Sequence, residues 1–226
     1  MRFECVIFDL DGTLLDTIDD LTNSINYALN KFGLATHSPK QCLKMIGNGK
    51  ENFVKKALPA DKLHLAEKLL EIAWGHYYDN ALIETRIYPE MLETLEKLAD
   101  YGVKMAVLTN KDQKTAKMIV DHYFCDRFFD SVTGAVNDIA PKPEPEKILN
   151  LINKMGFSAE KTLMVGDSEA DIAVGKNADV TVAAVSWGFR DKDTLEALSP
   201  DYLIDSPRQL LEIIDFEDAE SSKRAG

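Results

Sequence analysis

The sequence of 226 residues has few cysteines and no long apolar segment. Cys5, Cys42 and Cys125 are an odd number with no CxxC spacing, which argues against a disulfide framework and a structural zinc site. We therefore expect a reducing, cytoplasmic location. The short apolar stretch after Met1 is soon interrupted by two aspartates, and no later segment is apolar enough, so we expect neither a signal peptide nor a membrane span.

Positive charge is also scarce. The chain carries 26 Lys and Arg against 38 Asp and Glu, a formal net charge of -12, and the basic residues form no patch. Nucleic acid and anionic membranes would be repelled, so we expect neither as a partner. The same acidity means that any phosphate site must be neutralised locally, by a metal ion, a lysine or backbone N–H groups.

Four short apolar runs each end in polar residues. They are Cys5–Phe8, Lys104–Leu108, Thr162–Val165 and Thr181–Val185. Amphipathic helix patterns lie between them, such as Leu92 to Gly102 and Ile148 to Gly156. This alternation predicts an α/β fold, a doubly wound parallel sheet with helices on both faces and a ligand crevice at the strands' carboxyl ends. Tyr202–Ile204 is expected to add an edge strand.

From about Leu15 to Glu84 the strand signal gives way to helical spacing. The first stripe consists of Ile18, Leu21, Ile25, Leu29 and Phe32, and ends at Gly33. Ser38, Pro39 and Gln41 then form the pattern of an N-cap, first-turn proline and capping box, and a further stripe runs from Leu63 to Tyr77. We expect residues 15–84 to form a helical cap domain over a core made of residues 1–14 and 85–226.

The first polar cluster is Asp9-Leu10-Asp11-Gly12. A carboxylate at the end of a buried strand is costly unless a cation or hydrogen-bond donors satisfy it, and two so close together demand a cation. The pair also allows a division of labour, with Asp9 attacking while Asp11 holds or removes a proton. Alone, however, the motif is more simply a turn that leaves a strand.

Three later motifs follow other strands. Thr109 and Asn110 offer a hydroxyl and N–H groups suited to phosphoryl oxygens. Lys142, flanked by prolines, presents a point charge suited to phosphate. Asp167 and Asp171, one helical turn apart, offer oxygen ligands suited to Mg²⁺. Each alone is equally a helix cap or a solvated turn residue. Together, in this order, they supply a nucleophile, an acid/base, anion donors, a cation and metal ligands.

These motifs, DLDGTLLDT, TNK, PKPEP and GDSEAD, resemble those of the haloacid dehalogenase superfamily of aspartate-nucleophile phosphatases, and in particular its phosphoglycolate phosphatase-like branch. The resemblance covers nearly the whole chain. It implies that Asp9 forms an aspartyl-phosphate and that Asp11 protonates the leaving oxygen, then activates the hydrolytic water. It further implies that Thr109 and Lys142 grip the phosphoryl group.

The resemblance also implies a Mg²⁺ site. Asp9, the backbone carbonyl of Asp11, and Asp167 would bind the ion. Asp171 would support the metal's water molecules or Lys142. A cation there would neutralise the acidic cluster, which resolves the conflict between the negative chain and a phosphate substrate.

The substrate is expected to be a small phosphate ester chosen by the cap. The loop Gly47-Asn48-Gly49-Lys50 resembles the substrate loop of such caps, with Asn48 hydrogen bonding and Lys50 facing an anionic leaving group; it also matches an ordinary turn. Arg190, after the Thr181–Val185 run, is expected to face an anion at the mouth of the site. Compact anionic leaving groups are therefore favoured.

Several alternatives remain open. An inorganic pyrophosphatase, a 5'-nucleotidase and a β-phosphoglucomutase-like phosphomutase would share this site, although Thr13 is more typical of the phosphatases. Dehalogenation is disfavoured, because dehalogenases of the superfamily lack the second aspartate. A receiver-type signalling domain uses Asp, Thr, Lys and Mg²⁺ too, but without a cap, and a binding module would not need every chemical position filled. Both a monomer and a homodimer are compatible with the sequence.

Overall fold

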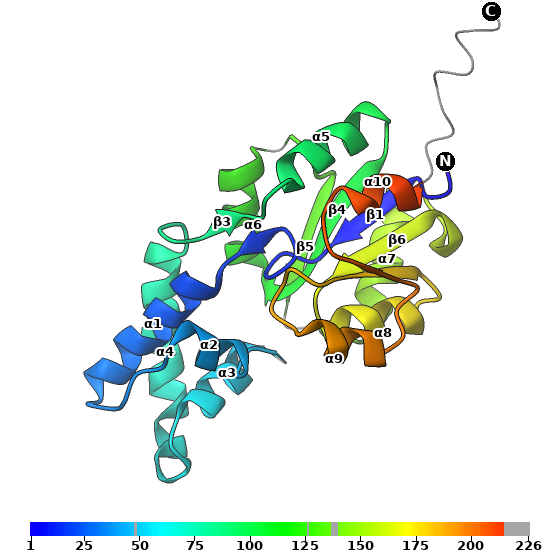
Figure 1. Ribbon diagram of the computed structural model, residues 1–226. Coiled ribbons are helices and arrows are strands. Elements are labelled where there is room, and N and C mark those ends of the chain that lie inside the picture. Colours follow the sequence, from blue (N-terminus) through cyan, green and yellow to red (C-terminus); the bar gives the residue numbers. More distant parts are fainter. Residues whose placement is uncertain (48, 126, 137–139, 215–226) are drawn as a thin grey trace, which may run out of the picture.

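The computed structural model describes residues 1–47, 49–125, 127–136 and 140–214. Its centre is a parallel sheet of six strands in the order β5-β4-β1-β6-β7-β8 (Figure 1). The strands are β1 (Cys5–Phe8), β4 (Lys104–Asp112), β5 (Ser131–Ala135), β6 (Thr162–Gly166), β7 (Thr181–Val185) and β8 (Tyr202–Ile204). The predicted doubly wound α/β fold is confirmed.

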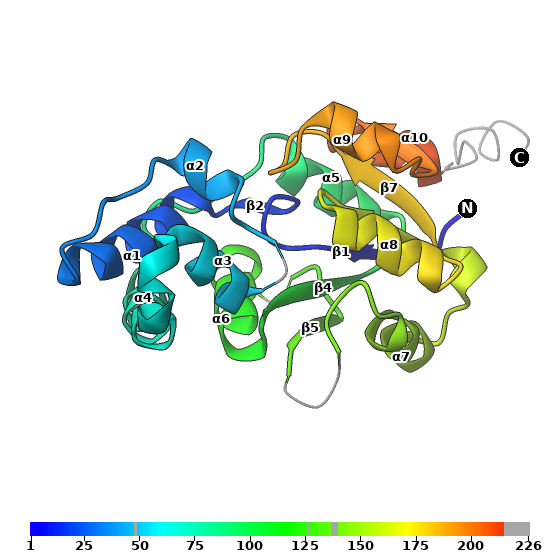
Figure 2. The same cartoon turned by 90° about the horizontal axis from the view of Figure 1, so that it is seen from below.

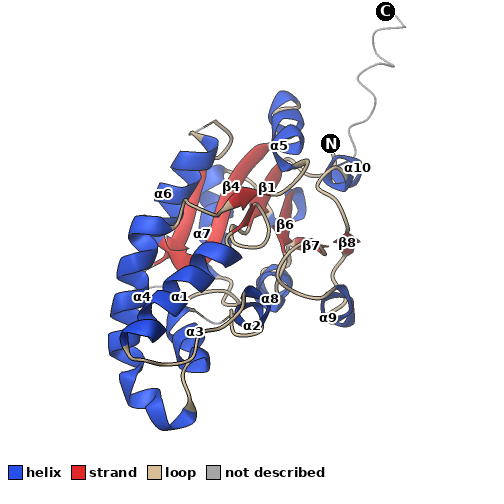
Figure 3. Cartoon of the chain, turned by 60° about the vertical axis from the view of Figure 1, so that its left-hand side comes forward, coloured by secondary structure: helices blue, strands red, loops and turns tan. Residues whose placement is uncertain are grey.

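Helices cover both faces of this sheet (Figure 3). They are α5 (Met91–Asp100), α6 (Gln113–Phe124), α7 (Glu146–Met155), α8 (Glu169–Asn177), α9 (Lys192–Ala197) and α10 (Gln209–Ile214). On β1, Val6 and Phe8 pack into one hydrophobic cluster with α5, α6 and α10, whereas Cys5 and Ile7 pack into another with α7, α8 and α9. Successive side chains of a strand point to opposite faces, so an uninterrupted apolar run suits a strand buried on both sides.

A short antiparallel ribbon connects the sheet to a separate group of helices. In this ribbon β2 (Leu15–Asp16) pairs with β3 (Arg86–Ile87). The helices between them are α1 (Ile18–Lys31), α2 (Pro39–Leu43), α3 (Lys50–Ala57) and α4 (Ala66–Asn80). They share a hydrophobic cluster of their own, with Ile25, Leu29, Phe53 and Leu69 at its centre, and they lie to one side of the sheet (Figures 1 and 2). We refer to α1–α4 as the cap and to the rest as the core.

The local signals predicted for the cap are largely observed. Helix α1 ends just before Gly33, which has a φ of +65°. The capping box of α2 is present, because the Gln41 amide N–H donates to the Ser38 hydroxyl at 3.3 Å and the Ser38 amide N–H donates to Gln41 Oε1 at 2.8 Å. No helix among the described residues combines the length and apolarity needed to cross a membrane.

Two predicted helix positions need correction, and one strand was missed. Leu63 was expected in the buried stripe of a helix, but it lies in a 3-10 turn (Ala60–Leu65) and its residue is 48% exposed. Leu92 is also exposed, because Met91 takes the buried position on α5. Strand β5 was not predicted: it is a half-buried edge strand of mostly polar or small residues, so it has no apolar run to reveal it.

Asp20 in α1 anchors the return of the chain from the cap. Its carboxylate is buried and accepts hydrogen bonds from the Glu84 amide at 2.9 Å and from the Thr85 amide and hydroxyl at 2.9 and 2.8 Å. Hydrogen bonds to a charged group are stronger than neutral ones. Asp20 therefore fixes the first turns of α1 to the segment that leads into β3.

We expect the substitution Asp20→Ala to lower the free energy of unfolding by about 2–4 kcal/mol, because it leaves buried N–H and O–H donors without an acceptor. Urea unfolding followed by circular dichroism measures this change. Asp19→Ala is a matched control, since Asp19 is exposed in the same helical turn and should lose less than about 1 kcal/mol. Equal losses for the two variants would contradict the anchoring role.

Candidate active site

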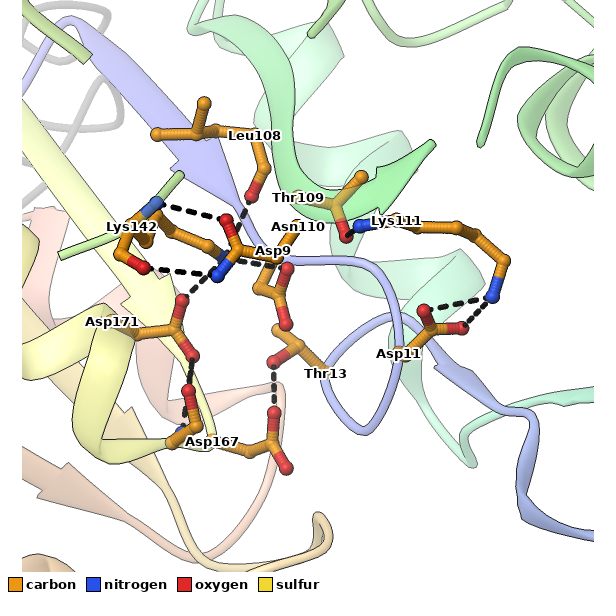
Figure 4. A network of polar contacts seen from close by, with 11 residues as sticks. Asp9, Asp11, Thr13, Leu108, Thr109, Asn110, Lys111, Lys142, Asp167 and Asp171 are labelled. Carbon is orange, nitrogen blue, oxygen red and sulfur yellow. Dashed lines mark hydrogen bonds and ion pairs between the residues drawn. The ribbon is translucent and has the colours of Figure 1, made fainter. Parts of the chain in front are cut away.

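The predicted site residues meet at the carboxyl edge of the three central strands. Asp9 follows β1, Thr109 lies in β4, and Asp167 follows β6. These strands are neighbours in the order β4-β1-β6, so their carboxyl ends deliver the side chains to one place (Figure 4). Lys142 precedes α7, and Asp171 lies in the first turn of α8.

Lys142 connects these groups. Its ammonium donates to Asp9 Oδ1 at 2.7 Å, to Asp171 Oδ1 at 2.6 Å and to the Leu108 carbonyl at 3.0 Å. An ammonium has three donors, so all of them are used. Since the residue is only 5% exposed, these contacts are formed away from solvent. Lys142 is thus a fixed buried cation rather than a solvated turn lysine.

The side chain of Asn110 contacts the backbone of Lys142. Its side-chain oxygen accepts from the Lys142 amide at 2.8 Å, and its side-chain nitrogen donates to the Lys142 carbonyl at 3.1 Å. The side-chain amide therefore holds the backbone of Lys142, and the predicted contact of Asn110 with substrate stays a prediction. Thr109 is buried, and its hydroxyl accepts from the Lys111 amide at 3.2 Å. Neither residue caps α6, because Asp112 has that role.

Asp9, Asp167 and Asp171 form a buried carboxylate cluster. One oxygen of each lies within 4.8 Å of the others, the arrangement that a bound metal ion requires. Carboxylate oxygens are the ligands that suit Mg²⁺. Both oxygens of Asp171 already accept hydrogen bonds from the protein. Its Oδ1 accepts from Lys142, and its Oδ2 accepts from the Ser168 amide at 3.0 Å and hydroxyl at 2.6 Å.

Backbone packed close to Asp167 fixes its carboxylate. The Phe189 amide donates to Oδ2 at 2.7 Å and the Thr13 hydroxyl donates to Oδ1 at 3.2 Å. A Cβ atom at Gly12 or at Gly188 would lie 2.3 Å from an atom of the Asp167 side chain. Gly12 also has a φ of +87°, so both space and backbone conformation require glycine there.

Burial and mutual repulsion disfavour the ionised carboxylates. Burial, together with the charges of Asp171 and Asp11, raises the pKa of Asp9 from its ordinary 3.8 to about 7, although Lys142 opposes the shift. Burial and then the charges of Asp9 and Asp171 raise the pKa of Asp167 well above its usual range. Three carboxylates against one ammonium leave an excess of two negative charges. A divalent cation matches that excess, so the residues fit a Mg²⁺ site.

Asp11 lies apart from this cluster. Its two oxygens each lie 2.9 Å from the Lys111 ammonium, and Oδ1 also accepts from the Thr17 hydroxyl at 2.8 Å. In Figure 4 its carboxylate points toward Lys111 and away from the contacts of Lys142. The side chain of Asp11 is therefore no member of the carboxylate cluster, and the metal contact of its backbone carbonyl stays a prediction.

Sequence reasoning missed the side chain of Lys111. It is 7% exposed, and its ammonium lies 4.8 Å from the ring centroid of Tyr77 on cap helix α4. The TNK motif drew attention to this residue only for its backbone N–H. The available signal was its position in the polar motif that follows the apolar part of β4, but its contact with Tyr77 depends on where the cap sits.

The structure describes two of the three residues predicted to lie in the cap loop and at the mouth of the site. Asn48 lies outside the described residues. Lys50 is the first residue of α3. The pKa of Asp112 is lowered overall: burial raises it, but hydrogen bonds from Thr115 and Tyr78 and the charge of Lys50 outweigh that effect. The charge of Lys50, at the start of cap helix α3, thus favours the ionised form of Asp112 at the end of β4.

Arg190 joins the core to the cap. Its Nε donates to the two Glu169 oxygens at 3.0 and 2.9 Å, and its terminal nitrogen donates to the Ile46 carbonyl at 2.8 Å. Gly47 has a φ of +123°, a backbone conformation that favours glycine, and a Cβ there would also lie 2.8 Å from this guanidinium. The structure thus commits Arg190 to a carboxylate and to the cap backbone, where the sequence suggested a substrate anion.

Comparison with known proteins finds similar sequences and similar folds. The family model described as haloacid dehalogenase-like hydrolase matches residues 6–185. A phosphoglycolate phosphatase of Aquifex aeolicus is 34% identical over 93% of this chain and 96% of its own length, and one of Haemophilus influenzae is 33% identical over 94% and 99%. The crystal structure of a predicted phosphoglycolate phosphatase from Haemophilus somnus is 29% identical, with a TM-score of 0.84 over 95% of this chain and 99% of that one.

The raised pKa values predict how stability depends on pH in metal-free protein. Between its unfolded pKa of 3.8 and its folded pKa of about 7, Asp9 releases its proton in the unfolded chain but keeps it in the folded one. The free energy of unfolding should therefore fall by roughly 2–4 kcal/mol as pH rises from about 4 to about 7, and then level off. Asp167 acts in the same direction.

Urea unfolding of chelator-treated protein at about pH 5 and pH 8 measures this dependence. Mg²⁺ should restore more stability at the higher pH, because it binds the ionised carboxylates. The Asp9→Asn variant is the control and should show a smaller decline. A metal-free protein that gains stability over this pH range would contradict the assignment of the cluster.

Proposed function

The chain belongs to the haloacid dehalogenase-like hydrolase family, and we propose that it is a Mg²⁺-dependent phosphatase that hydrolyses a small monoester such as phosphoglycolate. The observation that carries this proposal is the buried Asp9 at the end of β1, held by Lys142 beside Asp167 and Asp171. Relatives that this chain matches over more than nine tenths of its length are named for that activity.

In the proposed reaction Asp9 attacks the phosphorus atom and the bond to the leaving oxygen breaks. Asp11 gives its proton to that oxygen, so the product leaves as an alcohol. Asp11, now ionised, takes a proton from water, and the resulting oxygen attacks the phosphorus of the aspartyl-phosphate. This step releases inorganic phosphate and restores Asp9.

Charge on the phosphoryl oxygens is stabilised by fixed groups around Asp9. Lys142 lies 2.7 Å from Asp9 Oδ1 and would face the transferred group, as would the hydroxyl of Thr109. Asp9, Asp167 and the backbone carbonyl of Asp11 would hold Mg²⁺, which supplies a Lewis acid at the phosphoryl oxygens. Asn110 and Asp171 act on Lys142, through its backbone and its ammonium.

The cap meets the leaving group in this proposal. Asn48 and Lys50 are the expected contacts. Lys50 is the first residue of α3, and Arg190 holds the cap backbone nearby through the Ile46 carbonyl. The relatives' names favour a carboxylate-bearing ester over pyrophosphate, a nucleotide or a sugar phosphate in a mutase. The nucleophile on the first strand and the attached cap disfavour a receiver-type domain. The cytoplasmic location and the choice between monomer and homodimer stay predictions.

We expect purified protein to release inorganic phosphate from phosphoglycolate when Mg²⁺ is present and to lose that activity with a chelator. Asp9→Asn should reduce kcat by at least about a thousandfold, because the nucleophile is lost. Asp193→Asn, an exposed carboxylate on α9, is the matched control and should retain wild-type turnover. Full activity of Asp9→Asn, or none in the wild-type protein, would refute the proposed function.

A further inference from the structure

A second buried cation lies where the core meets the cap. Lys111 extends from the end of β4, and its ammonium lies 2.9 Å from both oxygens of Asp11. The ring of Tyr77, from cap helix α4, lies 4.8 Å from the same ammonium. The Lys111 side chain is 7% exposed, whereas that of Asp11 is 19% exposed, so the pair opens to solvent on the carboxylate side. Lys111 thus borders both the acid/base and the cap.

The ion pair with Lys111 engages both carboxylate oxygens of Asp11, the proposed acid/base. Both Asp11 oxygens contact Lys111, and one also accepts from Thr17 at 2.8 Å. Figure 4 shows the Asp11 carboxylate directed toward Lys111, while the Asp9 carboxylate points into the contacts of Lys142. To reach an oxygen leaving from a phosphoryl group on Asp9, Asp11 must loosen its contact with Lys111. Breaking a buried ion pair without a substitute leaves an uncompensated charge and is strongly unfavourable.

A substrate that carries a second anionic group can take the place of Asp11 beside the Lys111 ammonium. We propose that Lys111 binds the carboxylate of a compact leaving group, which replaces Asp11 on the ammonium and frees Asp11 to face the leaving oxygen. This inference rests on the proposed phosphatase function and names the substrate class of the same site. In this proposal a core residue selects the substrate, and the ring of Tyr77 from cap helix α4 lies beside that residue.

The other cations near the site fit this role less well. The three donors of Lys142 are occupied by Asp9, Asp171 and the Leu108 carbonyl. The guanidinium of Arg190 is bound to Glu169 and to the cap backbone. Lys50 is the remaining rival; it begins cap helix α3 and its charge lowers the pKa of Asp112, so the test includes a Lys50 variant.

Two esters that differ only in the second anion test the inference. Phosphoglycolate carries a carboxylate, and 2-hydroxyethyl phosphate has a neutral hydroxymethyl group in its place. Wild-type protein should prefer phosphoglycolate by at least about tenfold in kcat/KM. Lys111→Met should lower kcat/KM by about thirtyfold or more for phosphoglycolate, but by only about threefold for the neutral ester, where Asp11 merely loses its partner. Lys111→Arg should recover part of the preference.

Lys114→Met, an exposed lysine on α6, is the matched control and should change neither rate. The inference is overturned if wild-type protein shows no preference, if Lys111→Met slows both esters equally, or if Lys50→Met alone removes the preference. Equal slowing would mean that Lys111 only positions Asp11. If Lys111→Met does not fold, as judged by circular dichroism, Lys111→Gln replaces it. The same comparison of kcat/KM for the two esters, together with the wild-type preference, then tests the inference.

Asp9→Asn separates this inference from the proposed function. If Asp9→Asn still hydrolyses either ester, or if wild-type protein hydrolyses neither, the phosphatase proposal fails and the role of Lys111 fails with it. If wild type is active and Asp9→Asn is not, the pattern of the Lys111 variants reports on substrate recognition alone.

Discussion

The contact of the Lys142 ammonium with Asp9 and Asp171 is the interaction on which the site depends. Three buried carboxylates at the strand ends would repel one another, and a single ammonium removes only part of that repulsion. The surrounding fold keeps this cation in place through Asn110, which holds its backbone, and through Ser168, which holds Asp171. The remaining negative charge is what makes a divalent cation a necessary partner of the proposed chemistry.

Much of this arrangement could be predicted from the sequence, because the central strands are apolar runs and the chemistry follows each run directly. The parallel order then requires Asp9, Thr109 and Asp167 to meet at one edge of the sheet. Strand β5 was missed because an edge strand can be built from half-buried, polar or small residues. Its absence from the prediction did not affect the site, which lies at the inner strands.

The contacts that sequence reasoning missed all join distant segments. The side chain of Asn110 bonds to the backbone of Lys142, and Arg190 bonds to Glu169 and to the cap backbone. Lys111 was overlooked because its side chain is held between Asp11 and Tyr77 of the cap, which are both distant from it in the sequence. Such partners depend on how the cap sits on the core, which periodicity and motif spacing do not specify.

In the proposed function, the residues at the strand ends carry out the reaction, and the boundary with the cap selects the leaving group. Acid quenching of a single turnover, followed by mass spectrometry of the peptide that contains Asp9, tests the central claim most directly. The account predicts a transient gain of one phosphoryl group on Asp9, and its accumulation when Asp11→Asn slows hydrolysis. Phosphate release with no phosphorylated intermediate, or with the group on another residue, would contradict the account.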